Sequence, residues 1–316
     1  MKLSLAICTH NPREDCLAET LDSLRKLDPP AGDWAWELIV IDNASDEPLA
    51  GRIDISWHPD ARIVREGRLG LSHARVRSYH EARGGIMLYV DDDNILGPNY
   101  LNEVVAAFAA NPRLGAVGGR VLPRYEVTPP AWFNRGGFSL ACRDLGDDPL
   151  IARWDSQADR TYPDCAPIGA GMALRREAYG AYVAAASQDP VRLALGRKGT
   201  DLASGEDNDM ILTLLGNAWD VAYLPQLHID HIIPATRLTE TYMTRYAESS
   251  NRTWVIVLGL HGIRPWKSLA RWTLPARKAR AWLVQRAWRG PLNRIAWHGT
   301  CGQFDGQAAL RQIGRP

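Results

Sequence analysis

The sequence has few cysteines and no long uninterrupted hydrophobic run. Its five cysteines are scattered over 316 residues without a C-x-x-C pair, which argues against a disulfide framework or a zinc ribbon and favours a reducing compartment. The longest apolar stretch late in the chain, from Trp254 to Ile263, is interrupted by glycines and a histidine and has about half the length that a bilayer span needs. The apolar run before Thr9 is too short for a signal peptide. We therefore expect a cytoplasmic protein without a membrane-spanning segment.

Glycine-rich nucleotide-binding loops are also missing. The sequence has no G-x-x-x-x-G-K-[ST] loop, and Gly115, Gly118 and Gly119 have the wrong spacing for a dinucleotide-binding loop. Residues 9–12, Thr-His-Asn-Pro, follow the first predicted strand without the glycines that a sugar-phosphate nucleotidyltransferase needs there. These absences exclude P-loop and Rossmann-type sites and argue against a nucleotidyltransferase.

Acidic residues are absent between Glu248 and Asp305, although the whole sequence is balanced at 37 Lys and Arg against 36 Asp and Glu. The composition, 46% hydrophobic and 23% charged, is typical of a folded protein and excludes a disordered chain or a simple acidic or basic binder. The acid-free stretch also contains six of the twelve tryptophans. We interpret residues 246–316 as a basic helical C-terminal extension.

Two interpretations of this extension stay open. Its helices can pack against the preceding domain, with the tryptophans in the core. Alternatively, the segment from Gly262 to Gly299, with five tryptophans and nine Lys or Arg, can lie on an anionic membrane surface, with tryptophans at the interface and cations on the headgroups. The protein would then be peripheral on the inner face of the membrane. Nucleic-acid binding agrees with the charge alone, and we do not expect it.

Apolar strands alternate with helices along the first part of the chain. Most of these strands are continuous apolar runs, the type that is buried on both faces of a parallel sheet. The predicted strands are residues 3–8, 37–41, 62–64, 86–90, 167–174 and 219–224. The predicted helices are residues 12–27 with Asn11 as the cap, 71–82, 98–108, 176–186 and 206–215. Residues 121–163 are expected to be a partly irregular insertion, and the alternation predicts an α/β fold with a mainly parallel sheet flanked by helices.

Polar residues follow three of these strands, at Thr9, at Asp42 and at Asp91 to Asp93. Because ligands bind beyond the carboxyl ends of parallel strands, we expect the three groups to meet in one crevice. Asp91 and Asp93 alternate to the same side of an extended chain, and carboxylates suit Mg²⁺ or Mn²⁺ held together with substrate phosphates. The alternative is a solvated acidic loop that caps the next helix.

Glu206 and Asp207 open a predicted helix. Negative charge is favourable at a helix N-terminus. The two acids can therefore simply stabilise the first turn of this helix, or they can supply a general base in the crevice; both interpretations stay open. His231 and, more weakly, His228 are candidate metal ligands, although lone histidines are more often satisfied surface or core groups. Arg75 lies one turn into a predicted helix, where its planar guanidinium suits a diphosphate; the alternative is a surface arginine.

Seven short motifs follow one another along residues 1–245. They are AICTHNP at 6–12, VIDNAS at 40–45, GLSHAR at 70–75, YVDDD with its D-x-D at 89–93, GAGMALRR at 169–176, GED at 205–207, and Leu224-Pro225 followed by His231. In these motifs and their order the sequence resembles the family 2 inverting glycosyltransferases, which have the GT-A fold. Two positions depart from the family pattern: Val76 replaces a usual Asn, and His10 replaces a common aromatic residue such as Tyr.

The resemblance implies a role for each matching residue. The nucleotide would be bound by Thr9, Asn11, Asp42, Arg75, Asp91 and Asp92. A carboxylate accepts from an N–H group, so Asp42 suits uracil, thymine or guanine and not cytosine. The metal, Mn²⁺ or Mg²⁺, would be held by Asp93, Asp91 and His231. Asp207 would be the catalytic base with support from Glu206, and Gly169 and Gly171 would let the backbone approach the sugar or acceptor closely.

The implied activity is metal-dependent transfer of a sugar, with inversion, from a nucleotide-diphosphate sugar to an acceptor hydroxyl. Of the three bases that suit Asp42, uracil is the one we expect, so the expected donor is UDP-linked. The expected acceptor is a saccharide or a lipid-linked saccharide, in polysaccharide or glycolipid synthesis. Residues 1–120 would be the nucleotide-sugar-binding half, and residues 121–245 the acceptor-binding half of the same domain. The alternative is a non-catalytic carbohydrate- or membrane-binding protein on a transferase-like fold, against which the intact Asp93 and Asp207 argue.

Overall fold

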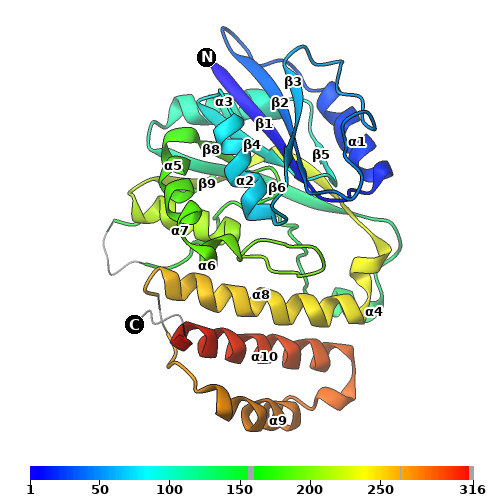
Figure 1. The fold of residues 1–316 in the computed structure, drawn as a ribbon, viewed down its shortest axis with the longest axis vertical. Coiled ribbons are helices and arrows are strands. Elements are labelled where there is room, and N and C mark those ends of the chain that lie inside the picture. Colours follow the sequence, from blue (N-terminus) through cyan, green and yellow to red (C-terminus); the bar gives the residue numbers. More distant parts are fainter. Residues whose placement is uncertain (156–159, 264, 313–316) are drawn as a thin grey trace. The chain divides into compact units, whose positions relative to one another are not determined.

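The computed structural model describes residues 1–155, 160–263 and 265–312 (Figure 1). The chain forms two compact units. The first consists of Met1–Arg124, Ser139–Leu193 and Asp209–Ile232, and the second of Tyr125–Phe138, Ala194–Asn208 and Ile233–Pro316. The predicted divisions after residues 120 and 245 stay predictions. Of the predicted basic extension, Arg264 and residues 313–316 lie outside the described residues.

The first unit is built on a mixed sheet that has nine strands within the described ranges. The strands are β1 (Lys2–Thr9), β2 (Ala35–Asn43), β3 (Ala61–Glu66), β4 (Ile86–Val90), β5 (Asn94–Leu96), β6 (Leu114–Tyr125), β7 (Leu150–Ala152), β8 (Ala173–Arg175) and β9 (Asp220–Ile233). Their order is β3-β2-β1-β4-β8-β6-β9-β5, with β7 paired to β9. The block β3-β2-β1-β4 is parallel, whereas β8 is antiparallel to both of its neighbours. The predicted α/β fold is confirmed.

Helices cover both faces of this sheet. They are α1 (Glu14–Arg25), α2 (Leu71–Glu81), α3 (Tyr100–Ala110), α5 (Arg176–Ser187), α6 (Pro190–Leu193) and α7 (Glu206–Gly216). One hydrophobic core joins α1 and α3 to the face of β1 that bears Leu5 and Ile7. The second core joins α2, α5 and α7 to the opposite face, which bears Ala6. Successive side chains of a strand point to opposite faces, so continuous apolar strands are what a sheet covered on both faces requires.

Most predicted strands and helices are confirmed within a few residues, and four differences have a physical reason. Helix α1 begins at Glu14 rather than Pro12, because Asn11 has a left-handed backbone with φ 46° and Arg13 is the N-cap. Strand β9 continues past Pro225 to Ile233, where an end was expected. The glycines of residues 115–119 hid strand β6 from the pattern. Of the expected strand 167–174, only residues 173 and 174 lie in the sheet, in β8, which continues to Arg175.

The second unit is helical. It contains α4 (Ala131–Gly136), η2 (Ala235–Leu238), α8 (Glu240–Leu260), η3 (Arg271–Thr273), α9 (Leu274–Val284), η4 (Ala287–Arg289) and α10 (Pro291–Gln312). Helices α8 and α10 lie side by side (Figure 1), and Gly302 permits their close approach, because a Cβ atom there would lie 2.0 Å from the Glu248 carbonyl oxygen. In the part of the chain that the structure describes, no helix combines the length and apolarity that a membrane crossing requires.

Candidate functional site

The carboxyl ends of β1, β2 and β4 meet at one edge of the parallel block, as predicted. Thr9 at the end of β1 lies opposite Asp42 of β2, and Ile7 lies opposite Val90, the last residue of β4. The Thr9 hydroxyl donates a hydrogen bond to an oxygen of Asp92. The structure therefore brings the first, second and fourth strand ends together in the first unit.

The three aspartates after β4 are shaped by a tight turn that ends at Asn94. The Asn94 N–H donates to the Asp91 carbonyl oxygen at 3.2 Å, and its side-chain oxygen accepts from the Asp91 N–H at 3.2 Å. Its Nδ2 donates to Asp93 Oδ1 at 3.2 Å. Asp91 and Asp92 stay half-buried, while Asp93 is buried. Asn94 was not among the predicted site residues, although an Asn after a strand is a common signal of such a turn.

Asp93 lies against His231, which the pairing of β5 with β9 places at this position. Asn94 is the register partner of His231, and His231 Nε2 lies 3.4 Å from Asp93 Oδ2. Both side chains are buried. Burial by itself would lower the pKa of His231, but the interactions with Asp93 and Cys142 raise it to about 9. An imidazole nitrogen and a carboxylate oxygen thus face each other out of bulk water.

Cys142 contacts the other nitrogen of this imidazole. Its Sγ lies 3.7 Å from His231 Nδ1. A partner on one ring nitrogen fixes the orientation of a ligating histidine and leaves the second nitrogen for the metal. Sequence reasoning missed Cys142, because the two residues are 89 positions apart and no local motif marks the contact. His228 lies on the same strand and is partly exposed. Its Nε2 lies 3.1 Å from Asp230 Oδ1, so the structure pairs it with Asp230 and does not bring it to Asp93.

Asp42 is buried and organises the loop after β2. Its Oδ1 accepts from the Ser45 N–H at 3.1 Å, and its Oδ2 accepts from the Leu49 N–H at 3.2 Å and from Arg65 Nη1 at 2.8 Å. Burial would raise the pKa of Asp42, but these hydrogen bonds and the Arg65 charge lower it. The carboxylate is therefore ionised and already holds the loop in place. Its contact with a nucleotide base stays a prediction.

Asn11 joins the loops that follow β1 and β2. Its N–H donates to Ser45 Oγ at 3.0 Å, its Nδ2 donates to Asp46 Oδ2 at 2.9 Å, and its Oδ1 accepts from the Asp46 N–H at 2.9 Å. These bonds explain its left-handed backbone. Asn11 therefore shapes the rim of the strand-end region, and direct contact with a nucleotide stays a prediction.

Arg75 lies inside the layer between α2 and the sheet. Its side chain is 2% exposed, and its guanidinium lies over the Tyr89 ring, 5.0 Å from the centroid. The alternative of a surface arginine is therefore wrong, because the cation packs on an aromatic face. The predicted contact with a diphosphate is not tested by this arrangement and stays a prediction.

Gly171 lies in the segment before β8, beside β4. Tyr100 donates from its hydroxyl to the Gly171 carbonyl oxygen at 2.6 Å, and the Tyr89 N–H donates to the Met172 carbonyl oxygen at 2.9 Å. Gly171 has φ +69°, and a Cβ atom there would lie 2.0 Å from Ile229 Cδ1. The glycine is required by its backbone conformation and by packing. The role of Gly169 and Gly171 toward a sugar or acceptor stays a prediction.

Replacing Gly171 with alanine is expected to lower the free energy of unfolding by about 2–5 kcal/mol, because the substitution adds overpacking to an unfavourable left-handed backbone. Chemical denaturation measures the change. Gly85→Ala is the matched control, since a Cβ atom there meets nothing within 4 Å. A Gly171→Ala protein as stable as the control would contradict this account of the segment.

Glu206 and Asp207 begin helix α7 and belong to the second unit, whereas α7 from Asp209 onward belongs to the first. Glu206 is buried, and its Oε2 accepts from the Gly205 N–H at 3.3 Å. Asp207 is partly exposed, and its Oδ1 accepts from the Asn208 N–H at 2.8 Å. Burial raises the pKa of Tyr246 of α8, and the negative charge of Asp207 adds to this effect. Both acids contribute to the helix start, and the more accessible one is Asp207.

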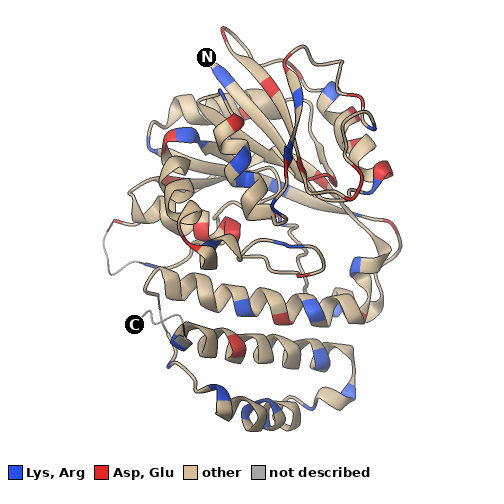
Figure 2. Cartoon of the chain, viewed as in Figure 1, with Lys and Arg blue, Asp and Glu red and all other residues tan. Residues whose placement is uncertain are grey.

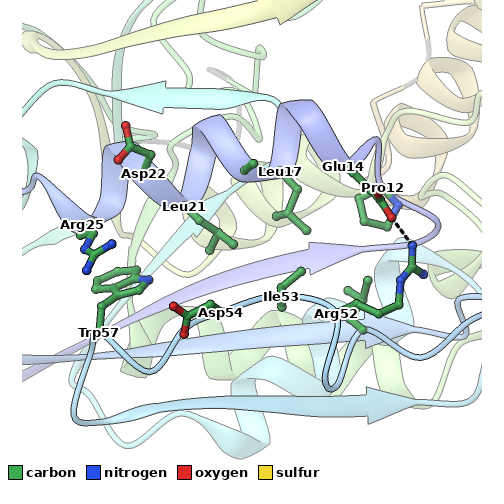
Figure 3. A pocket seen from close by; sticks show the side chains of 12 residues that line it. Pro12, Glu14, Leu17, Leu21, Asp22, Arg25, Arg52, Ile53, Asp54 and Trp57 are labelled. Atoms are coloured by element: carbon green, nitrogen blue, oxygen red, sulfur yellow. Dashed lines mark hydrogen bonds and ion pairs between the residues drawn. The ribbon is translucent and has the colours of Figure 1, made fainter.

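A separate pocket of about 530 Å³ lies between α1 and residues 49–57 (Figure 3). Its wall is apolar where Leu17, Leu21 and Trp57 line it, and an ion pair of 2.5 Å between Glu14 and Arg52 lies at its end. The lining comes mainly from α1 and this loop, and it includes Leu49, whose N–H donates to Asp42.

Comparison with known proteins is consistent with the motifs found in the sequence. The model of the family described as "Glycosyl transferase family 2" matches residues 4–181. A protein of Haloferax volcanii described as a glucosyl-dolichyl phosphate glucuronosyltransferase is 26% identical over 151 residues, which cover 46% of this chain and 47% of that protein. An uncharacterized protein, y4gI of Sinorhizobium fredii, is 31% identical over 115 residues, 35% of this chain and 12% of that protein. The chain thus spans less than half the length of these relatives.

Solved structures share the fold at low identity. Residues 1–349 of S. aureus TarS, solved in complex with UDP, match with a TM-score of 0.50 at 15% identity over 99% of this chain and 92% of that chain. GalNAc-T7, solved with UDP, GalNAc and Mn²⁺, matches with a TM-score of 0.55 at 16% identity over 100% of this chain and 58% of that chain. The mixed sheet flanked by helices is that of GT-A glycosyltransferases, which confirms the predicted fold.

Proposed function

The chain belongs to glycosyl transferase family 2, and on that premise we propose that it transfers a sugar from a UDP-linked donor to an acceptor hydroxyl with inversion, in polysaccharide or glycolipid synthesis. Sugar transfer itself follows from the family. The observation that best supports the finer proposal is the buried pair of Asp93 and His231, 3.4 Å apart, beside the other two aspartates at the strand ends.

The chemistry of this pair fits a divalent cation. Asp93 offers a carboxylate oxygen, and His231 offers a ring nitrogen once the cation has displaced the proton that its raised pKa retains. Mn²⁺ accepts both donor types. We assign Asp93, Asp91 and His231 to Mn²⁺ or Mg²⁺. A cation bound there would neutralise the negative charge on the departing nucleotide diphosphate. Cys142 orients His231 through Nδ1, so that Nε2 stays directed at Asp93.

The nucleotide is assigned to Thr9, Asn11, Asp42, Arg75, Asp91 and Asp92. The hydroxyl of Thr9 holds Asp92, and Asn11 and Asp42 fix the two loops that follow β1 and β2. A UDP donor is supported by the ionised Asp42, whose carboxylate can accept from the N3–H of uracil. Gly169 and Gly171 are assigned to the sugar or acceptor, where a backbone without side chains permits close approach.

Asp207 is proposed as the general base, with Glu206 in support. Its carboxylate would accept the proton of the acceptor hydroxyl while that oxygen bonds to the anomeric carbon, and the bond from this carbon to the diphosphate oxygen breaks. Attack from the face opposite the leaving group gives inversion in one displacement. Asp207 suits this role better than Glu206, because Glu206 is buried and bonded to the backbone.

The proposed acceptor is a saccharide carried on a lipid or a growing polysaccharide. The support is the name of the H. volcanii relative, which refers to a glucosyl-dolichyl phosphate. Because that match covers 46% of the chain, the acceptor is a proposal about class only.

A screen of nucleotide sugars for release of nucleoside diphosphate tests the donor and the metal. We expect release from a UDP-sugar in the presence of Mn²⁺ or Mg²⁺, a loss of activity in EDTA, and recovery when the cation is restored. GDP-sugars, and CMP-sugars assayed for release of CMP, serve as the comparison donors. Undiminished release in EDTA would overturn the metal assignment. Turnover of a GDP-sugar or a CMP-sugar alone would overturn the donor assignment.

A further inference from the structure

Large apolar side chains are exposed on α9 and the turns on either side of it. The exposed fractions are 85% for Trp272, 64% for Leu283, 70% for Val284 and 53% for Trp288. They are four of the ten large hydrophobic residues that are exposed in the described part of the chain, although they fall within 17 consecutive positions. Such a concentration is typical of an interaction surface.

The opposite side of α9 packs against α10. Ala281 is buried, the rings of Trp282 and Trp297 meet edge to face at 4.9 Å, and Trp297 Nε1 donates to the Lys278 carbonyl oxygen at 2.9 Å. These two tryptophans therefore pack between two helices of the extension itself, and packing of the extension against the preceding domain stays a prediction. Trp272 and Trp288 differ, because they remain exposed when α9 is in place.

The exposed side of α9 is amphipathic along its length. At 100° per residue, Ala276, Ala279 and Leu283 fall on one stripe. Val284 lies outside this stripe, between Arg280 and Arg277. Arg277 and Arg280 are exposed along the edge of this stripe. We call the set of Trp272, Arg277, Arg280, Leu283, Val284 and Trp288 the α9 face.

The charge around the α9 face is of one sign. No acidic residue occurs between Glu248 and Asp305, and Figure 2 shows α9 with basic residues and no acidic ones. Three cations of this stretch are paired within the fold: Lys278 lies 2.8 Å from Asp305, Arg294 pairs with Glu240, and Arg252 lies 3.3 Å from Asp201. Arg286 and Arg289, beyond the helix, are exposed like the arginines of the face.

A hollow of about 360 Å³ lies beside Trp272. Leu269 and Ala308 form apolar parts of its wall, and Arg271 and Arg311 contribute guanidinium groups. Arginine binds phosphate oxygens through its planar fork of N–H donors. The hollow therefore combines an apolar wall with phosphate-binding side chains next to an exposed tryptophan.

We propose that the α9 face binds the surface of an anionic lipid bilayer, with the axis of α9 parallel to the membrane plane. Leucine, valine and tryptophan side chains enter the boundary between headgroups and acyl chains, and arginines at the edge of the stripe reach the lipid phosphates. Tryptophan is favoured at this depth because its ring is apolar and its N–H is polar. The proposal does not depend on the proposed sugar transfer.

Two other occupants are disfavoured by the same observations. A second copy of this chain would bring two arginine-rich faces together, and like charges in an interface oppose association. A nucleic acid would meet the arginines, but the apolar stripe beside them would have no partner in a phosphate backbone. A bilayer surface satisfies both parts of the face at once.

Flotation of the full chain with vesicles of phosphatidylcholine alone, or mixed with phosphatidylglycerol, tests the proposal. We expect binding to the anionic vesicles that weakens as salt rises, because exposed charges are screened. Replacing Arg277 and Arg280 with glutamine is expected to weaken the partition coefficient about thirtyfold. Trp272→Gln with Leu283→Gln is expected to abolish flotation at low salt.

Ile151→Gln is the matched control, since Ile151 is an exposed hydrophobic residue on β7 and should leave flotation unchanged. Circular dichroism and a thermal melt establish that each variant is folded. Equal binding to neutral vesicles, or equal loss in the control, would overturn the proposal. So would a concentration-dependent dimer in sedimentation equilibrium that Leu283→Gln dissociates, because the face would then join two copies of the chain.

Discussion

Asp93→Ala is expected to reduce the rate of nucleoside diphosphate release about a thousandfold or more, with the protein still folded. The substitution removes a proposed metal ligand, and several kcal/mol of charge stabilisation correspond to three or more powers of ten in rate. The substitution also leaves the buried His231 without its carboxylate partner, which lowers the free energy of unfolding, so a thermal melt establishes that the variant is folded under the assay conditions. Steady-state kinetics measures the loss of rate, and calorimetric titration measures the affinity for Mn²⁺.

Asp230→Asn is the control for this variant. Asp230 lies next to His231 on β9, but its side chain is 46% exposed and pairs with His228, so both activity and Mn²⁺ affinity should be unchanged. An Asp93→Ala protein with normal activity would show that the pair with His231 is a structural element of the β5–β9 contact and not a metal site.

Asp207→Asn is expected to lower kcat by about 10²–10⁴, the usual contribution of a positioned general base, while donor binding is kept. The asparagine has nearly the same shape and can still accept from the Asn208 N–H, so the start of α7 should be preserved. Kinetics at saturating donor and acceptor, together with titration of the variant with UDP, separate turnover from binding.

Asp201→Asn provides the control within the same unit. Asp201 is 47% exposed and accepts from Ser249 and Arg252, so its substitution should change neither kcat nor donor affinity. If Asp207→Asn weakens donor binding and leaves turnover at saturation intact, the residue binds the donor and the base must be sought elsewhere.

The fold and the strand-end cluster could be predicted because local physics determines them. Residues 86–90 are a continuous apolar run, and the structure has β4 at these residues. Asp91 to Asp93 must then follow the strand, and parallel pairing brings them to the end of β1, where Thr9 contacts Asp92. Each step uses only the local sequence pattern and the pairing of neighbouring strands.

Contacts across long sequence separations could not be predicted. Cys142 touches His231 only because β9 continues past Pro225 and the segment at residues 139–143 passes beside it, and no periodicity encodes that path. The buried position of Arg75 depends on Tyr89 of a different element. The composition of the tail suggested both packing and membrane contact, and only the structure separates Trp282 and Trp297 from Trp272 and Trp288.

The anomeric configuration of the product tests the central claim most directly. With an α-linked UDP-sugar that the protein accepts as donor, NMR of the isolated glycoside reports the configuration of the new bond through the coupling of the anomeric proton. A single displacement with Asp207 as the base predicts a β-linked product. An α-linked product would contradict that mechanism, because retention requires a different course of reaction at the same carbon.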